Sequence, residues 1–342
     1  TGGARALHLA ASAGNSRAVR ELLDHEADPD ARETRWGQTP LIFAASAGRT
    51  AAVRVLLERG ADPSITTRVI DVPAQAGVDD AAGDARDEVL GRFQSQQDGS
   101  SGTWIPTPAQ VQEAVHAAQE VQRSLADAEE KDDNDDPQSE EFPGFTGLVG
   151  THGGLTALLH AAREGHVETV TALLDGGADI DQVGAGDATS PILIATINGH
   201  FDLALMLLER GADPNLTSVA GAGPLFTALN THWAPKARYP QQQAYQQQSS
   251  DYLQVMKALL EAGADPNARL DKHLWYMSYT FDLLNVNTAG ATPFWRAAYA
   301  TDVEAMKLLV RYGADPHVPT VMPPARRFRR GSAEPEQDPS GL

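Results

Sequence analysis

The chain has 342 residues, a formal net charge of −19 at pH 7 and no cysteine, which excludes disulfide bonds and cysteine-ligated metals. By count, residues 64–150 hold 18 acidic and 5 basic side chains, so −13 of the net charge lies in that stretch. This acidity argues against nucleic acids and anionic membranes as partners. No run of apolar residues is long enough to predict a membrane span.

A short sequence recurs along the chain, and each copy closes a stretch that is predicted to form two helices. The copies are Glu26-Ala27-Asp28-Pro29, Gly60-Ala61-Asp62-Pro63, Gly177-Ala178-Asp179, Gly211-Ala212-Asp213-Pro214, Gly263-Ala264-Asp265-Pro266 and Gly313-Ala314-Asp315-Pro316. Glu26 and Gly60 are 34 residues apart, as are Gly177 and Gly211. A fixed period in this range indicates small structural units stacked on one another.

The units also share an opening sequence. In the clearest copy, Gly37–Leu41, Thr39 is suited to cap the first helix and Pro40 to begin it. After a glycine-containing turn, the second helix carries apolar residues at helical spacing, as in Val53, Leu56 and Leu57. A glycine such as Gly60 then ends that helix as a C-terminal cap.

The two motifs resemble those of the ankyrin repeat, which opens with Thr-Pro-Leu-His-x-Ala-Ala and closes with Gly-Ala-Asp. Six copies cover roughly two-thirds of the chain. The resemblance implies an all-α fold, an ankyrin-repeat solenoid of helix-turn-helix units joined by β-turns or hairpins. Repeats 1–2 are assigned to residues 1–66, repeats 3–6 to 151–318, and a Pro/Arg-rich linker or tail to 319–342. The histidine of the family motif is present only as His8, and the other copies have apolar residues there.

The first of three insertions, at 67–150, is acidic and separates repeats 2 and 3. Its early part, through Ser101, is expected to be flexible because Gly, Asp, Gln and Ser are frequent. A helix is predicted over 108–130, where apolar residues recur at helical spacing. This helix could dock on the neighbouring repeats or bind a partner. The aspartates between 132 and 136 could ligate calcium, but the spacing of an EF-hand is absent, and a solvated linker is favoured.

The other two insertions are shorter and rich in aromatic residues. The insertion at 231–250 is expected to be an extended loop on the surface, with Trp233 as its anchor. The insertion at 268–289 could fold back on repeats 5 and 6 or form an interface. The residues predicted to bind a partner are Trp275, Tyr276, Tyr279 and Phe281 in that insertion, then Trp36 in the turn before repeat 2, with Trp233 as a further candidate.

No catalytic site, cofactor or metal site is predicted. The ten histidines show no zinc spacing, and His8, His166 and His200 stand at structural positions of the ankyrin motif. No nucleophile elbow, phosphate loop or dinucleotide fingerprint is present. The basic sequence at 326–330 is interpreted as a solvated linker, and we consider an ion pairing with the acidic run near 132–141 as a hypothesis.

These patterns favour a non-enzymatic module that binds a protein or peptide partner through the concave face of the solenoid and its aromatic loops. The alternative is a structural subunit of a larger exported bacterial assembly, since the chain resembles insertion-bearing ankyrin proteins of environmental bacteria. An enzyme with its site in the insertions has no support in the sequence. The Arg-rich, Ala-rich composition suits a bacterial source, and a periplasmic or extracellular location is favoured while a cytoplasmic one stays open. The sequence leaves open whether the chain is a segment of a longer protein.

Overall fold

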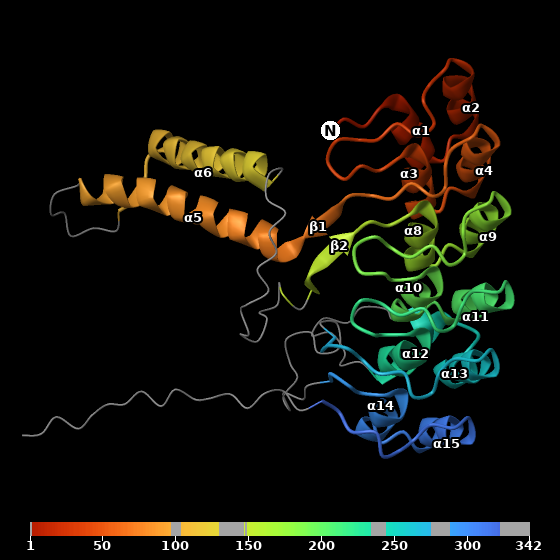
Figure 1. Cartoon of the computed structure of the whole chain (residues 1–342). Coiled ribbons are helices and arrows are strands. Elements are labelled where there is room, and N and C mark those ends of the chain that lie inside the picture. The colour runs from red at the N-terminus through yellow and green to blue at the C-terminus, as the bar shows by residue number, and fades with distance from the viewer. Residues whose placement is uncertain are drawn as a thin grey trace, which may run out of the picture.

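The computed structural model describes residues 2–96, 104–129, 147, 149–233, 244–274 and 288–321. Six helix pairs stack one on the next along the described chain (Figure 1). The pairs are α1 (Ala6–Ala13) with α2 (Ser16–Asp24), α3 (Pro40–Ser46) with α4 (Thr50–Glu58), α8 (Ala157–Glu164) with α9 (Val167–Asp175), α10 (Pro191–Ile197) with α11 (Phe201–Glu209), α12 (Pro224–Trp233) with α13 (Tyr252–Glu261), and α14 (Pro293–Tyr299) with α15 (Val303–Arg311). The predicted all-α solenoid is confirmed.

The inner helices begin as the sequence predicts. The Thr39 hydroxyl accepts a hydrogen bond from the Ile42 N–H at 3.3 Å, and Thr156, Ser190 and Thr292 cap α8, α10 and α14 in the same way. Pro40 occupies the first turn of α3, where its missing N–H removes no helical hydrogen bond. The shared opening sequence therefore sets the start of these four inner helices at the same place in their repeats.

A single hydrophobic core runs through the stack. Its fully buried members include Leu41, Leu56, Leu158, Leu173 and Leu207, which come from three successive repeats. Inner helix α3 packs on α8 and outer helix α4 on α9, so repeats 2 and 3 stack directly despite the insertion between them. Because each repeat buries its apolar faces against its neighbours, the stability of any one depends on the next.

The closing Asp-Pro segments are joined by hydrogen bonds from one repeat to the next. The Asp30 carboxylate accepts from the Asp62 N–H at 2.9 Å, and Asp181 accepts from the Asp213 N–H at 2.9 Å. Asn215 takes this position in the fourth repeat, where its amide oxygen accepts from the Asp265 N–H at 2.9 Å. These bonds fix the spacing of consecutive repeats at one edge of the stack.

The long insertion forms an arm that projects from the side of the stack (Figure 1). The arm starts and ends in a two-stranded antiparallel ribbon, in which β1 (Val69–Asp71) pairs with β2 (Thr151–Gly153). Beyond the ribbon, α5 (Val72–Ser95) and α6 (Pro108–Glu129) pack against each other as a helical hairpin. Helix α6 matches the helix predicted over 108–130.

Two expectations about this insertion are wrong. The part through Ser101 was expected to be flexible, but α5 occupies most of it. Helix α6 packs on α5 and not on the neighbouring repeats, one of the two roles considered for it, and Val111 and Val115 on this helix are each 42% exposed. The buried contacts of the hairpin involve Ala82, Val89 and Ala114, so small side chains allow close helix packing here. The acidic run after α6 lies outside the described residues.

The insertion after α12 is held by a buried carboxylate from the next repeat. Asp302 caps α15 by accepting from the Ala305 N–H at 3.0 Å, and its second oxygen accepts from the Trp233 indole at 2.8 Å and the Tyr252 hydroxyl at 2.7 Å. Burial alone would raise the pKa of Asp302, but these hydrogen bonds hold it below its ordinary value. Trp233 thus links repeat 5 to repeat 6. Residues 234–243 of this insertion lie outside the described part of the chain.

Replacing Asp302 should destabilise the fold. Asp302→Ala removes the cap of α15 and leaves the Trp233 and Tyr252 donors without their acceptor, so we expect a loss of about 2–3 kcal/mol in the free energy of unfolding. Urea unfolding at pH 7 measures this loss. The control is Glu304→Ala on the same helix. Glu304 forms an exposed ion pair with Lys307, so this substitution should cost about 0.5 kcal/mol or less. Equal effects of the two substitutions would contradict the assigned role of Asp302.

Candidate functional site

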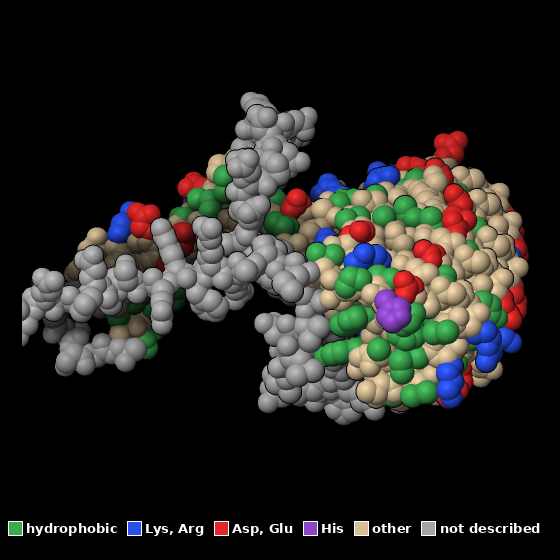
Figure 2. Space-filling model, turned by 60° about the horizontal axis from the view of Figure 1, so that its bottom comes forward, with side chains coloured by type: hydrophobic (Ala, Val, Ile, Leu, Met, Phe, Trp, Pro, Cys, Tyr) green, Lys and Arg blue, Asp and Glu red, His purple; other side chains and the backbone are tan. Residues whose placement is uncertain are grey.

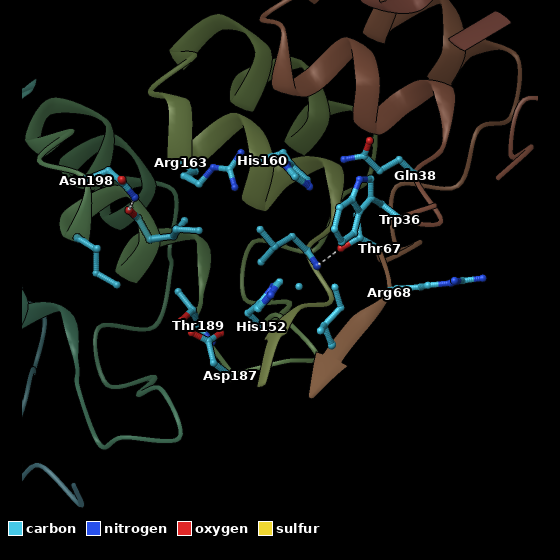
Figure 3. Close-up of a pocket in the computed structure, with 15 residues that line it drawn as sticks. Trp36, Gln38, Thr67, Arg68, His152, His160, Arg163, Asp187, Thr189 and Asn198 are labelled. Atoms are coloured by element: carbon cyan, nitrogen blue, oxygen red, sulfur yellow. Dashed lines mark hydrogen bonds between the residues drawn. The ribbon is translucent and has the colours of Figure 1, made fainter. Parts of the chain in front are cut away.

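A groove of about 520 Å³ lies beside the inner helices of repeats 2 to 4. Its walls come from the loop before α3, the β1–β2 ribbon and the loop before α10, and its floor comes from α8 and α10 (Figure 3). The lining residues are Trp36, Gln38, Thr67, Arg68, Ile70, His152, Gly153, Leu155, His160, Arg163, Asp187, Thr189, Ile194, Ile197 and Asn198. The groove therefore lies on a face made by several repeats together.

Trp36 is held at one wall by the turn that carries it. The Glu33 carboxylate, only 5% exposed, accepts backbone hydrogen bonds from Arg35 at 2.7 Å, Trp36 at 2.6 Å and Gln38 at 3.0 Å. Burial would raise the pKa of Glu33, and these three bonds outweigh burial and lower it. The Trp36 carbonyl also accepts from the Arg68 N–H at 2.8 Å. The turn is thus fixed from both sides, while the Trp36 side chain stays 40% exposed.

The opposite wall carries an acidic residue in the same position of its loop as Trp36. Asp187 accepts from the Thr189 N–H at 3.1 Å and from the Thr189 hydroxyl at 2.7 Å. Trp36 and Asp187 each stand directly before a residue with positive φ. That residue is Gly37, at 67°, in the first loop and Ala188, at 59°, in the second. In the loop between them the equivalent position is Gly153. The side chains of Trp36 and Asp187 therefore stand on either side of Gly153, which has no side chain.

Gly153 lines the groove, and the backbone at this point requires a glycine. A Cβ atom there would lie 2.1 Å from the Arg68 carbonyl oxygen, which is closer than atoms can approach. Its φ of 87° is also a conformation that disfavours other residues. The close approach of the two strands at this point thus demands a glycine.

His160 lies in the floor of the groove on α8. Its side chain is 6% exposed, and neither ring nitrogen has a hydrogen-bond partner among the described residues. Burial, with a smaller contribution from the nearby Arg163, lowers the pKa of His160 to about 4. The imidazole is therefore neutral at pH 7. Figure 3 shows His160 and Arg163 on the side of α8 that faces the groove.

Three other histidines have the structural roles that the sequence predicts. His8 contacts the Gln38 carbonyl through Nε2 at 3.1 Å, His166 the Ser46 carbonyl at 3.2 Å, and His200 the Arg163 carbonyl at 2.9 Å. Each of these contacts joins one repeat to its neighbour. His160 differs from them because its ring makes no such bond.

The predicted binding residues have separate positions. Trp36 lines the groove, as its assignment to an interface would require. Trp233 lies elsewhere, where its indole donates to Asp302. Trp275, Tyr276, Tyr279 and Phe281 lie outside the described residues. His160 and Asp187 were not predicted as site residues, although aligning the loops on the positive-φ position marks Trp36 and Asp187 as the large side chains beside Gly153.

The groove combines an aromatic and apolar surface with hydrogen-bonding groups at its rim. Leu155, Ile194 and Ile197 supply apolar area, while Gln38 and Asn198 supply amides. Within the described ranges, no group of three or more His, Asp or Glu side chains is placed to hold a metal ion. None of the helices described is both long and apolar enough to cross a membrane. This arrangement suits recognition of another molecule by shape and hydrogen bonding.

Lowering the pH should destabilise the fold through His160. The unfolded chain binds the proton near the ordinary pKa of 6.5 and the folded chain only near 4, so stability is full above pH 6.5 and is lost as the pH falls toward 4. The loss amounts to at most ~3 kcal/mol. Urea unfolding at pH 7 and pH 4.5 should show a smaller loss for His160→Leu than for the unmodified chain. His152→Leu, an exposed histidine of the same groove, is the control and should keep the full loss.

Comparison with protein families agrees with this architecture. A family model described as ankyrin repeats in three copies matches residues 2–67 and 121–218, and a model of the single ankyrin repeat matches residues 289–321. Together the matches cover more than half of the chain. No curated protein matches the sequence. The stretch from 219 to 288, which neither model matches, holds repeat 5 and the two shorter insertions.

Proposed function

The chain belongs to the ankyrin repeat family, and on this basis we propose that it binds a segment of a protein partner in the groove over repeats 2 to 4. Ankyrin repeats generally mediate protein–protein interaction, and proteins built from them are typically non-enzymatic. The observation that carries the proposal is Trp36, which is fixed by Glu33 at the edge of a groove with an apolar floor. Tryptophan is among the residues that most often dominate binding energy at interfaces.

The size and rigidity of the groove support a short, extended segment as the ligand. A volume of about 520 Å³ is in the range of sites that enclose a few side chains. The three backbone hydrogen bonds to Glu33 fix the loop before any partner arrives. Binding to a loop that is already ordered loses less conformational entropy, so more of the contact energy contributes to affinity.

Truncating Trp36 should weaken partner binding and leave the fold intact. We expect Trp36→Ala to lower affinity at least tenfold, about 1.4 kcal/mol or more, because the side chain would contact the ligand. The partner can be captured with the whole chain and identified by mass spectrometry, and its Kd measured by calorimetry. Leu9→Ala is the control, since Leu9 is 63% exposed and does not line the groove.

The same measurement distinguishes the groove from the third insertion. If Trp36→Ala leaves Kd unchanged while the double variant Trp275→Ala, Tyr276→Ala raises it, the partner binds at the aromatic insertion and the proposal for the groove is wrong. If both variants bind less tightly, the partner contacts both surfaces. The aromatic insertion stays a second proposed contact surface.

The alternative, a subunit of a larger exported bacterial assembly, is supported by one surface. Tyr299, Val303 and Val310 of repeat 6 are 40%, 52% and 51% exposed. Figure 2 shows hydrophobic side chains gathered on this end of the stack. Apolar area at the end of a repeat array favours contact with another molecule. Sedimentation analysis of native material tests this alternative, and a free monomer would count against it.

A further inference from the structure

His160 differs from His8, His166 and His200, the other histidines of the inner helices and turns in repeats 1 to 4. His8, His166 and His200 each bond to a carbonyl of a neighbouring repeat, whereas both ring nitrogens of His160 are buried without a partner in the described part of the chain. A buried polar atom without a hydrogen bond destabilises the folded state. The ring therefore calls for a reason other than the stacking of repeats.

Stacking does not require a histidine at this position of the repeat. The residue that takes its place in the preceding inner helix is Phe43, and in the following one it is Ile194. Both neighbours are apolar, and an apolar side chain at 160 would leave no buried nitrogen unpaired. Position 160, which borders the groove, thus holds a histidine where an apolar side chain would make the folded state more stable.

Arg163 lies one turn further along α8 and lines the same groove. Residues three apart lie on one face of a helix, and Figure 3 shows both side chains on the groove side. Among the described residues, Arg163 forms an ion pair with its sequence neighbour Glu164 alone, at 3.0 Å, and the two side chains are 40% and 43% exposed. Such an exposed ion pair contributes little to stability. Arg163 can therefore leave Glu164 and pair with a carboxylate of another molecule.

From this geometry we propose that the groove binds a carboxylate group of the partner segment, which the Arg163 guanidinium and a ring N–H of His160 hold together, while an adjoining apolar side chain packs beside Trp36. The inference rests on the proposed function of the groove and names the chemistry of its ligand. The carboxylate belongs either to an Asp or Glu side chain or to the C-terminus of the partner.

The groove can supply these donors without breaking its own structure. The His160 ring has no hydrogen bond that would be lost when it turns toward a ligand. The amide of Asn198 already donates to the Ile194 carbonyl at 2.8 Å, so the charged donor at this end is Arg163. The other ionisable groups that line the groove are Arg68 and His152 on the ribbon side and Asp187 on the opposite wall. Asp187 disfavours a second anion there, which directs the carboxylate toward α8.

The test uses random peptides displayed in two libraries, one with free C-termini and one with the peptides internal to the displayed protein, each selected on the whole chain at pH 7. We expect selected peptides to carry an acidic residue or a free C-terminus next to an apolar residue. The carboxylate of a selected peptide is then removed by replacing Glu with Gln or Asp with Asn, or by amidating the C-terminus. The change that raises Kd, by about tenfold or more, identifies the source of the carboxylate.

Variants of the chain test the two assigned residues. His160→Leu and Arg163→Gln should each raise the peptide Kd about tenfold or more, while His160→Leu keeps or increases the melting temperature. Arg17→Gln on α2 is the matched control for charge and should leave Kd unchanged. A fall in stability of His160→Leu together with unchanged Kd would identify a purely structural histidine.

The outcomes separate this inference from the proposed function. Peptides that lose affinity for Trp36→Ala but bind His160→Leu and Arg163→Gln normally, or that carry no carboxylate in common, overturn the inference and leave the function of the groove in place. If no peptide is selected, or if the selected peptides bind Trp36→Ala unchanged, the proposed function fails and the inference fails with it. Loss of binding in all three variants, with Arg17→Gln unaffected, supports both.

Discussion

Burial of apolar side chains between successive helix pairs is the interaction on which the rest of the molecule depends. Leu41 and Leu158 belong to different repeats but to one continuous core, and this core sets how the pairs stack. The stacking brings the loops before the inner helices side by side. Trp36 and Asp187, which are far apart in the sequence, flank one groove for this reason. The binding surface is therefore a consequence of the core.

The repeat architecture could be predicted because its signals are local. Thr39 caps α3 and Gly60 adopts the positive φ that ends a helix, and each signal acts within a few residues. Helix α5 could not be predicted in this way. Its glycines and scattered apolar residues give no clear stripe, and its partner α6 follows more than ten residues later. Packing of Ala82 and Val89 against another helix stabilises a segment whose own sequence suggests a loop.

The site was only partly predictable, since residue type reveals less than position. Trp36 could be chosen because a tryptophan in the turn between two repeats favours a role in binding. His160 could not, since the sequence gives no sign that its ring lacks a hydrogen-bond partner among the described residues while the rings of His8 and His200 each have one. His160 also stands at another position of its helix than His8, because it follows Thr156 by four residues whereas His8 follows Arg5 by three. Whether a ring nitrogen finds a hydrogen-bond partner depends on how neighbouring repeats pack, and the repeat motif does not specify this.

The long insertion and the groove have a common cause. Between repeats 1 and 2 the chain turns tightly around Glu33, but between repeats 2 and 3 the same hairpin continues outward as β1 and β2, with Ile70 opposite His152. The continued ribbon requires Gly153 at the position where another loop carries Trp36, and Gly153 lines the same groove as His160. The ribbon also adds Ile70 and His152 to the wall. Closing so long a loop adds only a modest entropic penalty, so the stack keeps its core while the insertion shapes the groove.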